Sequence, residues 1–372
     1  MTPEEREALG PVGERFVFRS NTYYQSLIDW NDPDDPIRRI VVPVAGELED
    51  WGRLDASDEG AYTVVPGLEH KYSDTALLLV NDVCGGYCRF CFRKRLFMDD
   101  NDEVVRDISR GLDYIREHTE ISNVLLTGGD PLILSTERLE SIVARLWKIE
   151  HVRIIRIGTK MPAFSPARIL RDPKLPEMFE KFRDPARRLY VMAHFNHPRE
   201  LTALAAEGLS MLQRAGATVV NQTPILAGVN DSAETLAALF ERLSHMGVPP
   251  YYVFQCRPTL GNKPYSVPVE QAFEIFTQAQ ARCSGLAKSA RFVMSHSTGK
   301  IEVVGKADGL VYMKCHRSPD PSAAGRFFAF KSNPEAHWFD DYEEAGGLVG
   351  SAPLSAPRAA CGGESDGGSC GR

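Results

Sequence analysis

Three cysteines, Cys84, Cys88 and Cys91, lie in one short segment and are spaced C-x3-C-x2-C. Thiolate sulfur is a soft ligand that suits iron–sulfur clusters. Three thiolates can hold three irons of a four-iron, four-sulfur cluster, and the fourth iron then stays open to a small molecule. A zinc site or three unrelated thiols is the alternative. The spacing, with the aromatic Phe90 before the last cysteine, favours the cluster.

The elements that must position these cysteines alternate along the chain. Short apolar runs and amphipathic patterns take turns, which predicts parallel βα units and an α/β fold. Six such units fit a partial (β/α)6 barrel that is open on one side. The expected strands are 75–81, 124–127, 152–157, 189–193, 218–222 and 251–255, and the expected helices lie near 102–118, 135–148, 198–214, 232–246 and 269–284.

The chain divides into four expected parts. Residues 1–70 form an N-terminal, partly helical leader, and residues 71–285 form the barrel core. Residues 286–337 form a small C-terminal β-rich extension, in which four short strands begin near 291, 301, 310 and 327. Residues 338–372 are first acidic and then rich in Gly, Ser, Ala and Pro, which predicts a flexible tail.

Polar and special residues follow every expected strand of the core, at its carboxyl end. Parallel α/β barrels build their active sites at this edge, so the clustering predicts one site there. In chain order these residues are the three cysteines, Gly128-Gly129-Asp130, Arg156 with Thr159 and Lys160, His194 to His197, Gln222, and Gln255 to Arg257.

The cysteine spacing is that of the radical S-adenosylmethionine (SAM) signature, and residues 66–285 resemble the lysine 2,3-aminomutase family. The resemblance rests on six runs in the family's order: PGLEHKY from Pro66, VLLTGGDPL from Val124, RIGT from Arg156, HFNHP from His194, NQTPILAGVND from Asn221 and PYYVFQC from Pro250. It implies a radical SAM barrel that binds a [4Fe-4S] cluster and SAM. One electron from the cluster would cleave SAM, and the resulting 5′-deoxyadenosyl radical would abstract a hydrogen from the substrate.

The resemblance also implies which residues surround SAM. Gly128, Gly129 and Asp130 would lie beside it, with Asp130 accepting a hydrogen bond from its amino group. His194 and Gln222 would line the same pocket. A plainer interpretation makes the glycine pair a strand-to-helix turn and Asp130 a helix cap.

Arg93, two residues after Cys91, matches the family arginine that binds the substrate carboxylate. A guanidinium fork suits a carboxylate. The alternative is a solvated basic face, because Arg89, Lys94 and Arg95 share the segment.

The family also uses pyridoxal phosphate (PLP), and here the chain departs from the pattern. The two arginines that hold the cofactor's phosphate align with Lys71 and Thr75. The glycine-rich run before the Schiff-base lysine is missing, and SHSTGK from Ser295 remains. Lys300 could be that lysine on a shortened loop, or it could belong to the strand that follows the lost loop.

Substrate choice differs as well. The two aspartates that bind the substrate ammonium in lysine enzymes align with Arg257 and Ser295. A guanidinium repels an ammonium, so lysine is an unfavourable substrate. Arg257 could instead bind an acidic or carbonyl-bearing group, or it could bind a phosphate or cap a helix.

Composition excludes several other classes. The net charge is −7 and the pI about 5.8, with no basic block, so nucleic-acid binding has no electrostatic support. No apolar run is long enough for a membrane span, and the polar N-terminus is no signal peptide. Eight cysteines in 372 residues are no disulfide framework, so we expect a cytoplasmic protein. Cys361 and Cys370 in the tail have no assigned role.

Two functions stay open at this stage. One is a radical SAM aminomutase, an isomerase of an amino acid other than lysine. The other is a PLP-independent radical SAM enzyme that carries out other C–H chemistry on a small molecule or peptide. A non-catalytic metal protein would not need the organised strand ends. We also expect an electron donor such as flavodoxin or ferredoxin, and a homo-oligomer is possible.

Overall fold

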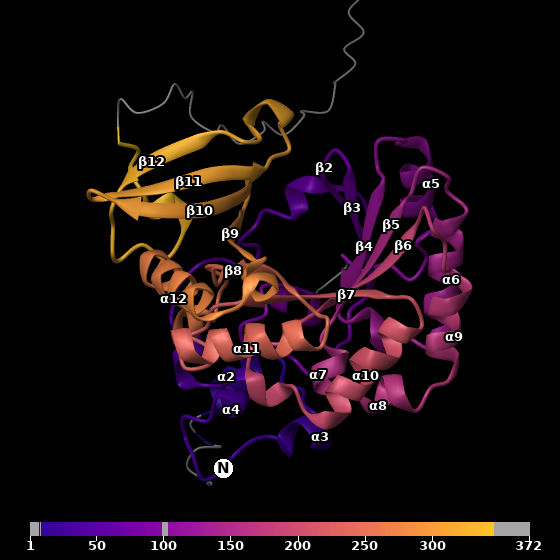
Figure 1. Cartoon of the computed structure of the whole chain (residues 1–372), viewed down its shortest axis with the longest axis horizontal. Helices are drawn as coiled ribbons and strands as arrows, with labels where there is room; N and C mark the ends of the chain where they lie inside the picture. Colours follow the sequence, from indigo (N-terminus) through magenta and orange to yellow (C-terminus); the bar gives the residue numbers. More distant parts are fainter. Residues whose placement is uncertain (1–6, 8, 99–102, 346–372) are drawn as a thin grey trace, which may run out of the picture.

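The computed structural model describes residues 7, 9–98 and 103–345. Within them one mixed sheet runs in chain order from β1 to β12 (Figure 1). The strands are β1 (Thr63–Val65), β2 (Leu68–Tyr72), β3 (Thr75–Asn81), β4 (Asn123–Gly128), β5 (Ile154–Thr159), β6 (Arg188–Ala193), β7 (Thr218–Pro224), β8 (Pro250–Phe254), β9 (Arg291–His296), β10 (Gly299–Ala307), β11 (Leu310–Arg317) and β12 (Phe327–Lys331).

From β3 to β9, each strand is parallel to the next one in the sheet. The pairs that involve β1, β2, β10, β11 or β12 are antiparallel. Helices lie along the outside of the parallel strands (Figure 1). The expected α/β class and partial barrel are therefore confirmed. β9 adds a further parallel strand, because it pairs with β8 through Tyr252 and Arg291.

Helices connect the parallel strands, and those that start at Thr136, Ala203 and Ala233 begin at a Ser or Thr cap. The connecting helices are α5 (Ser109–Glu117), α6 (Thr136–Trp147), α7 (Met161–Phe164), α8 (Ala167–Leu170), α9 (Lys174–Lys181), α10 (Ala203–Arg214), α11 (Ala233–His245) and α12 (Val269–Arg282). In α6 the Ser135 hydroxyl accepts from the backbone N–H of Arg138, which satisfies one donor of the first turn. Leu139, Ile142 and Leu146 then recur on the buried face.

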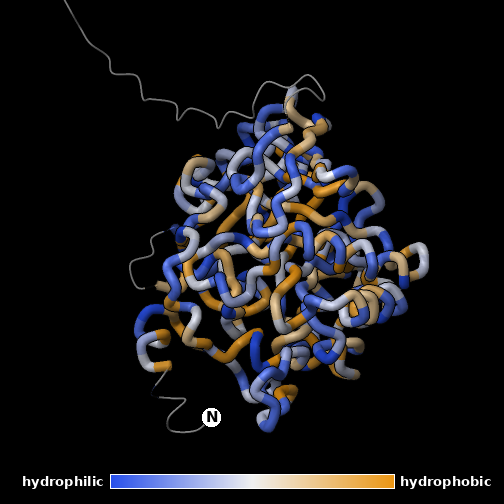
Figure 2. Tube along the Cα trace, turned by 90° about the vertical axis from the view of Figure 1, so that its left-hand side faces the viewer, coloured by the Kyte–Doolittle hydropathy of each residue, from blue (hydrophilic) through white to orange (hydrophobic). Residues whose placement is uncertain are grey.

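The core forms where these helices cover the sheet. In the parallel strands Leu78, Leu126, Ile157 and Val191 are fully buried, as expected for strands that are covered by helices. Hydrophobic segments lie inside the molecule, and hydrophilic segments dominate its periphery (Figure 2).

The N-terminal leader contributes strands to the sheet as well as helices, which the sequence did not predict. It holds the short helices α2 (Gly10–Arg15), α3 (Thr22–Gln25) and α4 (Pro36–Val41), and it also supplies β1 and most of β2 to the sheet. The expected boundary at 70 therefore lies inside β2, and the sheet continues from β8 to β9 across the expected boundary at 285. The helix expected from 102 begins at Ser109, after Asp107 accepts from the backbone N–H of Ser109. The helices α7 to α9, between β5 and β6, were not expected.

The predicted flexible tail lies mostly outside the described residues, as do Cys361 and Cys370. Among the helices that the structure describes, none combines the length and the apolar character needed to cross a bilayer.

Candidate active site

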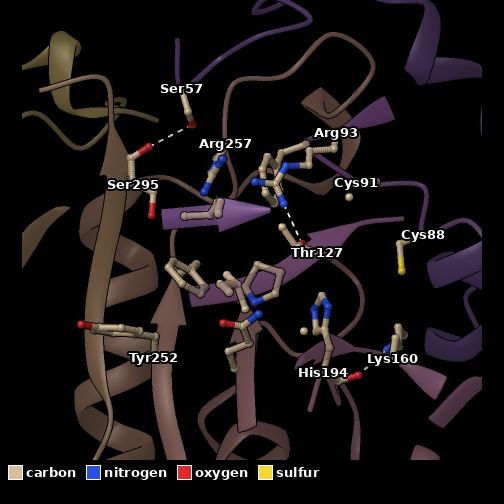
Figure 3. Close-up of a pocket in the computed structure, with 18 of the residues that line it drawn as sticks. Ser57, Cys88, Cys91, Arg93, Thr127, Lys160, His194, Tyr252, Arg257 and Ser295 are labelled. Carbon is tan, nitrogen blue, oxygen red and sulfur yellow. Dashed lines mark hydrogen bonds between the residues drawn. The ribbon is translucent and has the colours of Figure 1, made fainter. Parts of the chain in front are cut away.

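A cavity of about 310 Å³ opens at the carboxyl ends of the parallel strands. This volume is at the lower end of the range for small-molecule sites, roughly 300–1,000 Å³. Every residue to which the sequence analysis assigned a metal, cofactor or substrate role lines this cavity: Cys84, Cys88, Cys91, Arg93, Gly128, Gly129, Asp130, His194, Gln222, Arg257 and Lys300. Of the expected run from His194 to His197, only His194 lines it. Figure 3 shows Cys88, Cys91 and Lys160 on one side, Ser295 and Tyr252 on the other, and Arg93 between them.

The cysteine end of the cavity is formed by the loop that follows β3. Burial raises the pKa of the Cys88 thiol to about 12, and the nearby Lys160 ammonium lowers it in part. Within the described residues, no three His, Cys, Asp or Glu side chains are grouped so as to hold one metal ion. The three thiols all line the cavity, and the preference for a cluster over zinc still rests on the spacing of the cysteines in the sequence.

The leader holds this loop from outside. The backbone N–H of Tyr87 donates to the carbonyl of Arg19 (2.9 Å). The Arg89 guanidinium makes a two-point contact with the buried Glu47 carboxylate, with distances of 3.0 Å and 2.7 Å. These contacts tie Tyr87 and Arg89, the residues on either side of Cys88, to the leader.

Gly128 and Gly129 let the end of β4 approach the start of the cysteine loop. Gly128 has a φ of +107°, and a Cβ there would lie 2.4 Å from the carbonyl oxygen of Asn81. A Cβ on Gly129 would lie 2.4 Å from the carbonyl oxygen of Val83. Both glycines are therefore required by a close approach of two backbone segments.

Asp130 lines the cavity, but its carboxylate already has partners. One oxygen accepts from the Thr159 hydroxyl (2.7 Å) and the Leu132 N–H (3.0 Å), and the other accepts from the Lys160 N–H (2.7 Å). These are the contacts of a capping residue that joins β4 to β5. The binding of the SAM amino group by Asp130 stays a prediction.

His194 and Lys160 belong to one buried network beside the cysteines. Lys160 Nζ donates to Glu200 (2.6 Å), Asn196 (2.7 Å) and the His194 carbonyl (3.0 Å). Burial, and then the Lys160 charge, hold the pKa of His194 well below its usual range, so the ring is neutral. Its Nε2 lies 3.1 Å from the Asn196 amide nitrogen, which must be the donor, and the ring proton is therefore on Nδ1. Gln222 lines the cavity from β7.

Arg93 is buried and its fork is filled by an internal carboxylate. Its Nη2 and Nε donate to the two oxygens of Glu59 (2.8 Å and 3.1 Å), and its Nη1 donates to Thr127 (2.9 Å). Although burial alone would raise the pKa of Glu59, Arg93 and its arginine neighbours lower it to about 2. A substrate carboxylate could reach this fork only if Glu59 moved, so the assigned role of Arg93 stays a prediction.

Arg257 lies in the middle of the cavity and is incompletely paired. Its Cζ sits 3.5 Å from the centroid of the Phe92 ring, and its nearest carboxylate oxygen, on Glu59, is 3.9 Å from Nη1. That Nη1 is buried without a hydrogen-bond partner. Burial lowers the pKa of Arg257 to about 10, and Glu59 offsets part of this effect. A buried donor without an acceptor is costly unless a ligand supplies one.

Lys300 lies at the far end of the cavity, near the start of β10. Its Nζ is 4.5 Å from the Tyr252 ring centroid and 5.2 Å from that of Phe254. Burial, followed by the charges of Arg257 and Arg156, holds the pKa of Lys300 well below its usual range. This favours the neutral amine, the form in which lysine is a nucleophile. Lys300 thus belongs to a strand and also lines the cavity, and its role as the Schiff-base lysine stays a prediction.

Two carboxylate side chains line the cavity that the sequence analysis did not assign to the site. Glu59 is paired with Arg93, and Glu69 lies 3.6 Å from the same guanidinium. Burial and the Glu59 charge raise the pKa of Glu69 to about 8, and its Oε1 is buried without a hydrogen-bond partner. The position of Glu69 inside the family run PGLEHKY from Pro66 was the available signal for it. Nothing in the local sequence pointed to Glu59.

Arg317 was also missed. It ends β11, far from the cysteines in sequence, and lines the same cavity. Only the return of β11 over the open side of the barrel brings it there.

The comparisons with known proteins first show the class of enzyme to which the chain belongs. A model of the radical SAM superfamily matches residues 78–240. The chain is 62% identical over 342 residues, 92% of its length, to a protein of Aquifex aeolicus (strain VF5) named "Putative L-lysine 2,3-aminomutase", of which 91% is covered. It is 38% identical to the L-lysine 2,3-aminomutase of Clostridium subterminale, over 77% of this chain and 68% of that one. It is 35% identical to the glutamate 2,3-aminomutase of Clostridioides difficile (strain 630), over 77% and 67%.

The chain is therefore a radical SAM enzyme. Within that superfamily it belongs to the lysine 2,3-aminomutase family, as a divergent member of isomerase type. Membership implies a [4Fe-4S] cluster and SAM, for which the cysteine end of the cavity provides three thiols.

Proposed function

We propose that this chain is a radical SAM amino-acid 2,3-aminomutase whose substrate is an amino acid with a second acidic or carbonyl-bearing group. The observation that carries the proposal is the joint lining of one cavity by the three cysteines, Arg257 and Lys300. An enzyme of this class needs the radical source and the substrate groups to face one enclosed space.

The cysteine end would hold the cluster and SAM. Cys84, Cys88 and Cys91 would bind three irons, and the backbone of Gly128-Gly129, with His194 and Gln222, would bound the space for SAM. When bound, the pair supplies a 5′-deoxyadenosyl radical. The chain's own contribution is to exclude water and to keep the neutral His194 ring in place through Asn196.

The middle of the cavity would select the substrate. Arg257 replaces one family aspartate, and Ser295 replaces the other. Neither residue therefore offers a negative charge for a lysine ammonium. Of the missed carboxylates, Glu59 is taken up by Arg93 and Arg95, at 2.8 Å and 2.7 Å. The unpartnered Nη1 of Arg257 would instead donate to an acidic or carbonyl oxygen of the substrate.

The far end would hold PLP, which supplies an electrophilic aldehyde and an electron sink when bound. Lys300, whose amine is kept neutral by burial, would be the residue that holds the cofactor through its aldehyde. The electron donor, the oligomeric state and the cytoplasmic location stay predictions from sequence.

The test is anaerobic reconstitution of the full chain, followed by assays of SAM cleavage and product formation on a panel of amino acids. We expect deuterium to move between SAM and a glutamate-like substrate, and a 2,3-amino shift in the product. Turnover of lysine but not of glutamate-like compounds would overturn the substrate assignment. SAM cleavage without any retained PLP or amino shift would support the PLP-independent alternative.

A further inference from the structure

The far end of the cavity carries several basic side chains from four strands. Lys71 comes from β2, Arg156 from β5, Lys300 from β10 and Arg317 from β11, and all of them line the cavity. The charged groups that act most strongly on Lys300 are Arg257, Arg156, Arg317 and Lys71, and every one is positive. An anionic ligand group would relieve this crowding.

Arg317 stands beside the position where an expected cation is missing. Its Nη2 lies 3.2 Å from the Thr75 hydroxyl, and its Cζ lies 4.3 Å from the centroid of the Tyr72 ring. It also pairs with Asp74, whose side chain is 60% exposed. A surface partner of this kind is screened by solvent and holds its cation weakly. The guanidinium is therefore placed at the Thr75 site without being neutralised by a buried charge.

The neighbouring cations are partly committed, but none to a buried carboxylate. Lys71 Nζ donates to the backbone carbonyl of His296 (2.6 Å), and Arg156 Nε donates to the Asn123 side chain (2.8 Å). Both partners are neutral, so the positive charges remain available to an anion. A guanidinium fork matches the oxygen geometry of a phosphate, and a lysine adds a point charge.

We propose that Arg317, together with Lys71 and Arg156, forms the phosphate-binding group for PLP in this chain, with Arg317 taking the place of the arginine that Thr75 replaces. The proposal rests on the cofactor assignment made above. It adds that the cation has moved from the start of β3 to the end of β11. The hairpin β9–β10, with its short turn at Ser297 and Thr298, brings Lys300 to the same end.

The test uses two aldehydes that differ only in the phosphate, PLP and pyridoxal. Each is titrated into the anaerobically reconstituted full chain and followed by visible absorbance, and the Lys300 peptide is examined by mass spectrometry after borohydride reduction. We expect the wild-type protein to bind PLP at least tenfold more tightly than pyridoxal. Arg317→Gln should remove most of that preference, because it weakens the binding of PLP much more than that of pyridoxal.

Arg291→Gln is the matched control, because Arg291 pairs with Glu302 and does not line the cavity. The double variant Thr75→Arg with Arg317→Gln should restore the preference for PLP, which a merely structural role of Arg317 would not do.

Equal losses for PLP and pyridoxal, or no binding of either by the wild-type protein, would overturn the proposal. SAM cleavage and amino-acid product are measured on the same samples. A protein that forms product but binds both aldehydes alike would therefore refute the phosphate group and leave the proposed reaction standing.

Discussion

The two ends of the cavity differ in how their polar groups are paired. At the cysteine end Asp130, Lys160 and Glu200 have short bonds to partners in the protein. In the middle and far end, Arg257 Nη1 and Glu69 Oε1 are buried without a partner. At the cysteine end, these polar side chains are therefore already paired within the protein. In the rest of the cavity, these two buried atoms have no hydrogen-bond partner in the protein, and this is also where the sequence departs from its family.

Replacing one of the three cavity cysteines should abolish both iron binding and SAM cleavage at the cysteine end. We expect Cys88→Ala to lose bound iron and to lower SAM cleavage to below about 1% of wild type, because a cluster held by two thiolates is unstable. Iron and sulfide analysis and the cleavage assay measure this. Cys283→Ala is the control, since Cys283 is buried near Ala237 and away from the cavity. If Cys88→Ala retained both iron and cleavage, the metal assignment would be wrong.

Replacing the far-end lysine should separate the two ends. Lys300→Ala should reduce amino-acid product by about 100-fold, because it removes the neutral amine that would hold the cofactor. Cleavage of SAM without product should persist within about twofold, because the cysteine end is untouched. Lys314→Ala serves as the control, since Lys314 lies over Phe327 and does not line the cavity. Equal loss of both activities would show that the ends are not independent.

Arg257 should affect substrate affinity more than turnover. Removing a charge-assisted hydrogen bond costs about 2 kcal/mol, so Arg257→Gln should raise the KM for an acidic amino acid by about 30-fold. Arg257→Lys keeps the charge without the fork and should recover part of the affinity. Steady-state kinetics on the preferred substrate measure both values. An unchanged KM would argue that Arg257 only stacks on Phe92.

Glu69 should make stability depend on pH. Its folded-state pKa of about 8 is above the ordinary value of 4.5, so the native carboxyl keeps a proton that the unfolded chain loses. Between these values the native state binds more protons, and stability falls as pH rises until pH passes about 8. From pH 7 to 9 this loss should be about 1.4 kcal/mol.

Glu69→Gln should remove that loss, as measured by denaturant unfolding at the two pH values. The comparison with wild type is needed because the pKa of Lys71, lowered by burial to about 8, acts in the opposite direction above pH 8. The exposed Glu207→Gln should leave the wild-type pH dependence unchanged. An identical slope in Glu69→Gln and wild type would contradict the assignment.

The fold was predictable where one periodicity dominated. The strand β3 was expected over the same residues that form it, because a run of buried apolar residues between turns permits little else. Short elements were less predictable: α7 has only four residues, and its Met161-Pro162 start resembles a loop. The pairing of β2 with β3 depends on antiparallel contacts such as Glu69 with Leu77, which local sequence does not encode.

The sequence by itself determined the radical SAM class and the family, because the cysteine spacing and the six flanking runs lie on short contiguous stretches. It also located the carboxyl ends of the strands, and the residues to which it gave a metal, cofactor or substrate role all line one cavity. Only the tertiary structure decided the charge of that cavity. Glu59 fills the fork of Arg93, Glu69 is buried beside it, and Arg317 returns on β11 to Thr75. These contacts join residues far apart in the chain, and the charge each group carries depends on burial and on neighbours that only the folded molecule supplies.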